Sequence, residues 1–248
     1  MSDSQAWVLG LHAVKSALQR QGSAQELLID GKRRDARIKE ILELAEIAGI
    51  PWQQISARVL DERFSGDNHQ GVALRVRQRQ TQDEPYLKAL LKRLEEPAFL
   101  LILDGVQDPH NLGACLRSAD GAGVQAVIAP RDRSVALTST VRKVASGAAE
   151  TVPFVQVSNL SRTLKWLKAE GVWLIGTAGE AAETLYEVDL RGPLALVMGG
   201  EGKGLRRLTR EQCDLLVKLP MAGSVESLNV SVACGVSLYE AVRQRDNV

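Results

Sequence analysis

From Ala98 onward, short apolar runs alternate with segments of helical spacing. The runs are apolar at successive positions, so both faces of each strand would be buried. Strands of this kind that alternate with helices are typical of a parallel sheet covered on both sides. The predicted strands are Phe99–Leu103, Ala126–Ile128, Phe154–Val157, Val172–Gly176, Leu194–Met198 and Leu215–Leu219, and the predicted helices are Leu112–Gly121, Thr138–Ser146, Leu160–Glu170, Leu205–Glu211 and Leu228–Arg243.

The first part of the chain has a shorter version of this pattern. Asp35–Ala48 is an amphipathic helix that Gly49 would end. The pattern indicates a small α/β domain of about 75 residues, near the lower limit for an independent core. Its other predicted elements are a helix after Trp7, strands at Glu26–Asp30, Pro51–Ile55 and Gly71–Val76, and a helix at Ala57–Phe64.

A polar segment separates the two patterns. RQRQTQDEP, residues 77–85, contains no aliphatic residue and ends in proline, as is common in linkers. An amphipathic helix over Tyr86–Glu96 follows and is stopped by Pro97. The sequence therefore predicts an N-terminal domain over residues 1–77, a linker over 78–88 and a C-terminal domain over 89–248.

Two of the predicted strands end in loops of small residues. Leu194–Met198 is followed by GGEGKG, and Leu215–Leu219 by PMAGSVES. In a parallel sheet such loops lie side by side at the edge where ligands bind, and glycines let the backbone approach a ligand closely. Neither loop fits the P-loop or the G-x-G-x-x-G pattern. The loops predict a small-molecule pocket, with a glycine-rich surface hairpin as the alternative. Their polar residues are Glu201, expected to be buried, Ser224, Ser227 and Asn229.

The loop after the strand Phe99–Leu103 also carries candidate chemistry. Asn111 can cap a helix that begins at Leu112. Arg117 lies between one and two helical turns further on, and its planar guanidinium can hold phosphate oxygens near the positive end of the helix. A surface salt bridge is the alternative for Arg117.

The composition argues against a globally basic nucleic-acid-binding protein, a metalloprotein and a membrane protein. The 248 residues contain 31 Lys+Arg and 30 Asp+Glu, so a nucleic-acid surface would be a local patch on a chain of net charge +1. The three cysteines and three histidines have no metal-ligand spacing, and no metal site is expected. Neither a membrane-spanning run nor a signal-peptide core is present, which favours a cytoplasmic protein that does not enter a membrane and keeps its cysteines reduced.

Three ordered motifs carry a family resemblance. D-x-x-x-D-P-x-N-x-G-x-x-x-R at residues 104–117, V-M-G-x-E-G-x-G at 197–204 and L-P-M-x-G-x-V-x-S-L-N-V-S-V-A at 219–233 resemble the motifs of the SpoU RNA ribose methyltransferases, of the SPOUT superfamily. G-x-H-A-V at 10–14 and H-Q-G at 69–71 resemble the substrate-binding domain attached to many of them, whose fold is similar to that of ribosomal protein L30e. The resemblance covers nearly the whole chain.

The resemblance implies an architecture and a cofactor. The expected fold is an α/β methyltransferase domain with a parallel sheet and a C-terminal trefoil knot, which composition could not indicate because knots are very rare. The cofactor would be S-adenosylmethionine. A homodimer through the methyltransferase domain is expected, with the active site at or near the subunit interface. The implied cofactor-binding residues are Gly199, Leu219, Leu228, Met198, Gly200, Gly204 and Met221.

The resemblance also implies a set of catalytic residues: Asn111, Arg117, Glu201, Ser227 and Asn229. Guanidinium is not normally deprotonated in proteins, so our hypothesis is that Arg117 binds a phosphate and stabilises developing alkoxide charge instead of acting as the base. Asn111 would orient the ribose or Arg117, and Glu201 would hold its loop in place. Ser227 and Asn229 would arrange the third loop.

A cluster of basic residues lies where the helix over Asp35–Ala48 is expected to begin. By itself it could be a solvent-exposed helix end, but an RNA substrate favours a role in binding phosphate. The cluster consists of Lys32, Arg33, Arg34 and Arg37. His12 and His69 are equally consistent with RNA contact and with ordinary core or loop positions. The candidate RNA-binding residues are therefore His12, Arg33, Arg34 and His69.

The activity that the resemblance implies is 2'-O-methylation of a guanosine ribose in the peptidyl-transferase-centre loop of bacterial 23S rRNA, as free RNA or in a pre-50S particle. The separate N-terminal domain with its His-Gln-Gly motif favours this substrate. One alternative is a tRNA guanosine 2'-O-methyltransferase. The other is a non-catalytic RNA-binding ribosome assembly factor that has kept the fold.

Overall fold

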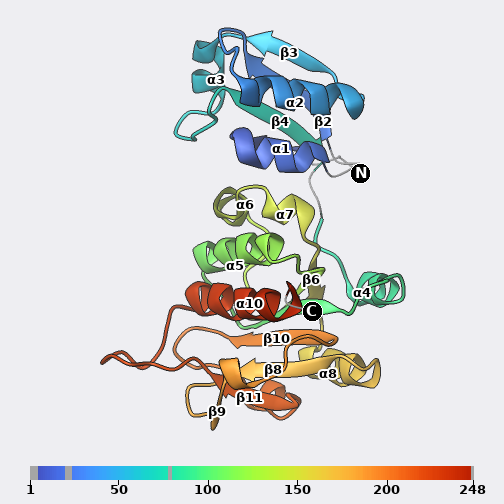
Figure 1. The fold of residues 1–248 in the computed structure, drawn as a ribbon, viewed down its shortest axis with the longest axis vertical. Helices are drawn as coiled ribbons and strands as arrows, with labels where there is room; N and C mark the ends of the chain where they lie inside the picture. Colours follow the sequence, from blue (N-terminus) through green and yellow to red (C-terminus); the bar gives the residue numbers. More distant parts are fainter. Residues whose placement is uncertain (1–4, 20–23, 78–79, 247–248) are drawn as a thin grey trace. The chain divides into compact units, whose positions relative to one another are not determined.

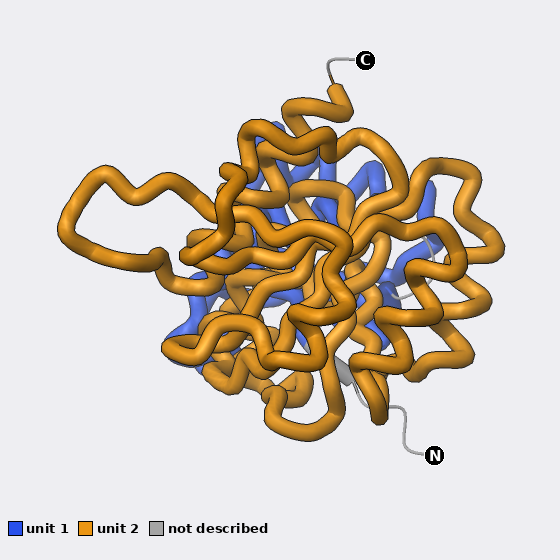
Figure 2. The backbone as a smooth tube through the Cα atoms, turned by 90° about the horizontal axis from the view of Figure 1, so that it is seen from below, with its two compact units in different colours: residues 1–79 blue, residues 80–248 orange. Residues whose placement is uncertain are grey.

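The computed structural model describes residues 5–19, 24–77 and 80–246. The chain divides into two compact units, residues 1–79 and 80–248 (Figure 2). Each unit has its own sheet and its own buried core, so each is described by itself.

The first unit is a four-stranded mixed sheet in the order β1-β4-β2-β3. The β4 strand runs antiparallel to β1 and β2, and β3 is parallel to β2. Helices α1 and α2 pack on one face, while Leu60 of α3 and Phe64, the residue just after α3, cover the other. The elements are β1 (Gln5–Leu9), α1 (Leu11–Gln19), β2 (Ala24–Asp30), α2 (Ala36–Ile47), β3 (Trp52–Ile55), α3 (Ala57–Arg63) and β4 (Val72–Arg77).

The second unit is built on a seven-stranded sheet in the order β7-β6-β5-β10-β8-β11-β9 (Figure 1). All of its neighbouring strands are parallel. Its elements are α4 (Glu84–Leu91), β5 (Phe99–Asp104), α5 (Pro109–Gly121), β6 (Ala126–Pro130), α6 (Ser139–Ala145), α7 (Ala148–Thr151), β7 (Phe154–Val157), α8 (Leu160–Ala169), β8 (Trp173–Thr177), β9 (Glu183–Thr184), a short 3-10 helix (Leu185–Glu187), β10 (Leu194–Gly199), α9 (Arg207–Arg210), β11 (Leu215–Lys218) and α10 (Val230–Asp246).

Burial on both faces of this sheet explains why its strands are apolar throughout. Along β5, Leu101 and Leu103 pack with α5, α6 and α10 on one face, whereas Leu100 and Ile102 pack with α4 and α8 on the other. Successive side chains of a strand point to opposite faces, so an element buried on both sides needs an unbroken apolar run. The predicted parallel sheet with helices on both faces is confirmed.

The segment expected to be a linker is partly structured and docked on the second unit. Gln82 extends the sheet edge: its N–H donates to Phe154 O at 2.8 Å, and Gln156 N–H donates back to Gln82 O at 2.9 Å. The helix after it begins at Glu84, two positions before the predicted start, because the Asp83 carboxylate accepts from Tyr86 N–H at 3.1 Å and caps the first turn.

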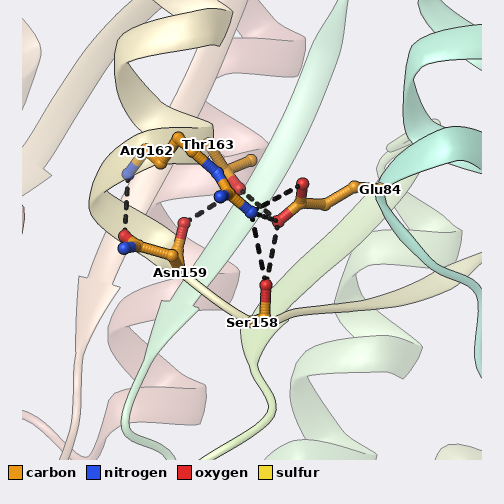
Figure 3. Close-up of polar contacts among 5 residues, drawn as sticks. All are labelled: Glu84, Ser158, Asn159, Arg162 and Thr163. Atoms are coloured by element: carbon orange, nitrogen blue, oxygen red, sulfur yellow. Dashed lines mark hydrogen bonds and ion pairs between the residues drawn. The ribbon is translucent and has the colours of Figure 1, made fainter.

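Glu84 fastens the start of α4 to the start of α8 (Figure 3). Its carboxylate accepts from the Arg162 guanidinium at 3.3 Å and from the Ser158 and Thr163 hydroxyls at 3.5 Å. The carboxylate therefore lies at a helix N-terminus, where the backbone dipole favours negative charge.

We predict that apolar packing contributes more to the docking of α4 than the contacts of Figure 3 do. Leu87 is fully buried, so Leu87→Ala should lower the free energy of unfolding by about 2–4 kcal/mol. Glu84→Ala should cost less than about 1 kcal/mol, because Arg162 is largely exposed. Urea denaturation of the full chain measures both, with Glu84→Gln as the charge-only control. A larger loss for Glu84→Ala than for Leu87→Ala would contradict the prediction.

Candidate functional site

The loops after three neighbouring strands of the second unit enclose a cavity of about 460 Å³ at the carboxyl edge of the sheet. Parallel α/β sheets bind ligands at this edge, and the volume is in the range of small-molecule sites. The lining consists of Thr177–Glu180 at the end of β8, Met198–Leu205 at the end of β10, Val217–Leu219 with Met221 at the end of β11, Glu226–Val230 at the start of α10, and Arg210 and Ala233.

All seven residues predicted to bind the cofactor line this cavity, as do three of the five predicted catalytic residues. The three are Glu201, Ser227 and Asn229. Asn111 and Arg117 lie on α5 and are not among the described lining residues. The structure thus brings the second and third motifs together, while the roles of these residues remain predictions.

The loop after β10 is a tight hairpin that requires glycine. A Cβ on Gly199 would lie 2.2 Å from the carbonyl carbon of Gly204, and a Cβ on Gly200 would lie 2.4 Å from Gly105 O. Gly204 N–H donates to Gly200 O at 3.1 Å and closes the hairpin, with Gly204 at a φ of +62°. The backbone of the second motif is therefore folded back on itself and pressed against the first-motif loop.

An ion pair between a buried carboxylate and a partly exposed arginine fixes the end of this hairpin. The Asp104 side chain is fully buried at the end of β5 and accepts from Arg206 Nε at 2.5 Å and from Arg206 N–H at 3.0 Å. A buried carboxylate is costly unless it is paired and hydrogen-bonded, and Arg206 meets both requirements. Sequence reasoning did not select either residue for the site, although Asp104 is the first position of the first motif.

Two expectations about the first and second motifs were wrong. The cap of α5 is Asp108, whose carboxylate accepts from His110 N–H at 2.7 Å, and not Asn111; Pro109 fits the first helical position, so the helix begins earlier. Glu201 is exposed and not buried, because its neighbours in the hairpin are glycines without side chains to cover it.

Asn111 nevertheless joins the first motif to the second. Its side chain is buried in the first turn of α5, and its Nδ2 donates to the Glu201 carboxylate. The glycine hairpin is thus held to the first-motif segment from both of its sides, by Arg206 on Asp104 and by Glu201 on Asn111.

Arg117 lies on an exposed face of α5, and its Nη1 is 3.5 Å from the Ser146 hydroxyl. Within the described part of the chain it has no carboxylate partner, so the salt-bridge alternative is not what the structure shows. Its guanidinium is available to an anionic ligand.

The third motif is an exposed loop that ends in a capped helix. Residues 222–229 are all exposed, and Figure 1 shows the segment between β11 and α10 reaching out from the rest of the unit. Asn229 Oδ1 accepts from Ser231 N–H at 2.9 Å and from the Ser231 hydroxyl at 2.7 Å. Asn229 therefore sets where α10 begins.

In the first unit, His69 is held in a turn. Gly71 N–H donates to His69 Nδ1 at 3.0 Å, so the ring proton is on Nε2 and donates to Asp61 at 2.9 Å. The next residue, Gln70, has a φ of +50° and accepts from Leu11 N–H through Oε1 at 3.0 Å. The His-Gln-Gly motif thereby fastens the start of α1 to the start of β4.

The predicted RNA-binding residues therefore differ in their surroundings. Arg33 is half-buried, with Nε donating to Asp35 at 2.8 Å and its Nη1 donating to Gln70 O. Asp35 also caps α2, and the Arg33 guanidinium lowers the pKa of that carboxyl. His12 and Arg34 are exposed. The geometry leaves His12 and Arg34 accessible to a ligand, whereas His69 and Arg33 stabilise the turn.

The cysteines are packing residues. Cys115 and Cys234 are buried, and burial raises the pKa of the Cys213 thiol to about 12. Across the described ranges, no group of His, Cys, Asp and Glu could hold a metal ion. The same ranges contain no helix with the length and apolarity needed to cross a bilayer.

Comparison with known proteins decides the family. Residues 98–239 match the model of the SpoU rRNA methylase family, and residues 7–82 match the model of the RNA 2'-O ribose methyltransferase substrate-binding domain. The chain belongs to the SpoU rRNA methylase family. The resemblance drawn from the three motifs is confirmed.

Two relatives within this family are similar over nearly their full length. The 23S rRNA (guanosine-2'-O-)-methyltransferase RlmB of Pectobacterium atrosepticum is 56% identical over 96% of this chain and 98% of its own, and the protein of the same name from Escherichia coli K12 is 54% identical over the same shares. The SpoU methyltransferase AviRb from Streptomyces viridochromogenes, solved with AdoMet, has the same fold, with a TM-score of 0.74, 24% identity and coverage of 98% of this chain and 92% of its own.

We predict that the Asp104–Arg206 pair holds the glycine hairpin in place. Asp104→Ala should lower the free energy of unfolding by about 2 kcal/mol, because it removes the buried acceptor of both the Arg206 backbone N–H and the Arg206 guanidinium. Hydrogen exchange at the Gly200 and Gly204 amides should accelerate. The matched control is Asp189→Ala, which removes an exposed carboxylate paired with Arg191 at 2.8 Å and should change little. Equal losses in the two variants, measured by urea denaturation, would contradict the prediction.

Proposed function

We propose that this protein transfers a methyl group from S-adenosylmethionine to the 2'-oxygen of a guanosine ribose in 23S rRNA. The observation that carries the proposal is the 56% identity, over 96% of the chain, to a methyltransferase named for this substrate. We place the target guanosine in the peptidyl-transferase-centre loop and the protein in the cytoplasm.

The cavity fits the cofactor. S-adenosylmethionine, when bound, supplies a methyl group on a sulfonium centre. Met198, Leu219, Met221 and Leu228 offer apolar surface for an adenine ring, and backbone groups around Gly199 offer hydrogen bonds. The cavity lining carries charges of both signs, as suits a ligand with cationic groups and a carboxylate: Glu180, Glu201 and Glu226 on one side of the balance, and Lys203, Arg210 and Lys218 on the other.

Arg117 acts on the RNA. Its guanidinium stays protonated, so it holds a phosphate next to the reacting ribose and stabilises charge that develops on the 2'-oxygen. The 2'-hydroxyl proton leaves to that phosphate or to water. The residues that hold the ribose and its phosphate would raise the rate by fixing the 2'-oxygen in a reactive orientation toward the methyl group that the cofactor would supply.

The other predicted catalytic residues organise the loops around this reaction. Asn111 holds Glu201, and with it the glycine hairpin that faces the cofactor. Asn229 fixes the start of α10, and Ser227 lies two residues before it on the cavity wall. In the N-terminal domain, taken as residues 1–77 with an L30e-like fold, His12 and Arg34 contact RNA phosphate or sugar, and Arg33 and His69 shape that surface.

The methyltransferase domain forms a homodimer through α10. Val232, Val236 and Tyr239 recur along one face of this helix and are 36–53% exposed, a larger apolar face than a solvated helix usually shows. The dimer brings Arg117 of one protomer to the cavity of the other, which accounts for the absence of Arg117 from the described lining of the cavity in its own chain. The C-terminal segment forms the trefoil knot of the SPOUT superfamily.

The proposal predicts a single methylated site. Protein-free 23S rRNA and bulk tRNA are incubated with the protein and tritiated S-adenosylmethionine, and the products are mapped with nucleases. Label should appear in one alkali-resistant Gm dinucleotide of 23S rRNA, because a 2'-O-methyl group blocks alkaline cleavage at that position. Label in tRNA would move the function to tRNA guanosine methylation. No label in either RNA or in pre-50S particles, with cofactor bound by calorimetry, would indicate a non-catalytic assembly factor.

Complementation between two inactive variants tests the shared site. Gly199→Val should abolish cofactor binding, because its side chain would collide with the Gly204 backbone. Arg117→Ala should retain cofactor binding and lose turnover. If the site combines Arg117 of one protomer with the cavity of the other, one of the two sites in a mixed dimer is intact.

Equal amounts of the two variants are mixed and allowed to exchange subunits. Random pairing makes about half of the dimers mixed, and each mixed dimer has one working site of two, so about a quarter of the parent activity should return. A mixture that stays inactive although heterodimers are detected would mean that each site is contained in one protomer.

A further inference from the structure

Helix α6 ends in a conformation that favours glycine, yet the residue there is serine. Ser146 has φ 50° and ψ 43°, and Gly147 follows with a φ of +96°. A left-handed residue at a helix end is ordinarily glycine or asparagine, because a side chain there is strained. A serine at this position therefore needs a reason beyond ending the helix.

The Ser146 hydroxyl is not needed to end α6, and it does not cap α7 either. The Ser146 backbone N–H donates to Lys143 O at 3.3 Å, as a glycine amide would. The short helix α7 has no side-chain cap. The hydroxyl donates only a long bond to Val144 O at 3.5 Å and accepts from Arg117 Nη1 at 3.5 Å.

The position of Ser146 is set by close packing between α5 and α6. Gly113 on α5 has no room for a Cβ, which would lie 2.7 Å from Val144 Cβ and 2.8 Å from Val141 O. The corner between α6 and α7 is further held by the ion pair of Arg142 with Glu150. The serine hydroxyl is thus presented to Arg117 by a well-packed frame.

Arg117 needs such a fixed contact. It lies on an exposed helix face with no carboxylate partner in the described ranges, and a long arginine side chain on a surface samples many rotamers. An oxygen acceptor at a fixed position selects the rotamers that direct the guanidinium toward it. Strained residues are often kept where they place a functional group.

We propose that Ser146 is a positioning residue for Arg117, and that the left-handed conformation at the end of α6 serves to bring its hydroxyl to the guanidinium. This inference rests on the proposed function, in which Arg117 holds RNA phosphate during methyl transfer. Ser146 acts through Arg117 and does not contact the reacting atoms.

Three substitutions separate positioning from folding. Ser146→Gly removes the hydroxyl and relieves the strain, so the Tm should be unchanged or raised while kcat falls about tenfold, with unchanged KM for S-adenosylmethionine. Ser146→Asn tolerates the left-handed conformation and offers a carbonyl acceptor, so most of the activity should return. Ser146→Ala loses the hydroxyl and keeps the strain, so it should lose activity without gaining stability.

A double-mutant cycle tests whether the effect passes through Arg117. In an Arg117→Ala background, Ser146→Gly should leave the residual single-turnover rate unchanged. The order of the Arg117 side chain, measured by NMR relaxation of its ¹⁵Nε, should fall in Ser146→Gly and recover in Ser146→Asn. The inference is overturned if Ser146→Gly keeps both the parent kcat and the parent order of Arg117, or if activity is lost only together with Tm. If the parent transfers no methyl group to RNA, the proposed function fails, and the NMR measurement still decides whether Ser146 orders Arg117.

Discussion

The carboxyl ends of β5 and β10 are neighbours in the sheet, with Gly199 in register with Asp104, and the loops that follow them touch through backbone atoms. This contact is possible only because Gly200 has no side chain, and the hairpin can fold back on itself only because Gly199 has none. The part of the cavity wall formed by the glycine hairpin depends on this contact. The hairpin that it positions carries Glu201 to Asn111 and returns the chain to Arg206 beside Asp104.

Folding the hairpin costs conformational entropy, and polar contacts at Asp104 offset this cost. A glycine-rich hairpin loses much conformational entropy when it folds, and it has few side chains to bury in return. The buried Asp104 carboxylate offsets this by accepting both a backbone and a side-chain donor from Arg206. The hairpin is consequently defined by polar contacts at its two ends, and its middle stays open to the cavity.

The sequence was most informative where a single physical requirement dominates a segment. Burial on both faces leaves unbroken apolar runs, so the strands of the parallel sheet could be located from the pattern alone. Close backbone contact leaves only glycine, so the hairpin of the second motif could be located as well. The family was recognisable because its motifs record these requirements in order along the chain.

Where two residue types compete for one role, the sequence could not decide between them. Asp108 and Asn111 are both good helix caps, and the choice depended on the fit of Pro109 to the first turn. Arg33 and Arg34 look alike in sequence, but only Arg33 reaches the Gln70 carbonyl. The ion pair between Asp104 and Arg206 joins residues 102 positions apart, and no local pattern indicates such a pair.

The loop over residues 222–229 differs from the rest of the cavity wall, since all of its residues are exposed. A segment with so few buried contacts has low local stability, and a molecule that packs against it must bear the entropy of ordering it. When two molecules both contact this loop, the first to bind pays the entropic cost of ordering it. The second then binds more tightly, because the loop is already ordered. Their affinities are then linked with no change in the remainder of the fold, and the linkage is reciprocal. Under the proposed function, S-adenosylmethionine in the cavity and a partner protomer that reaches this loop from α10 would be two such molecules. Cofactor occupancy and assembly would then be thermodynamically linked through the loop.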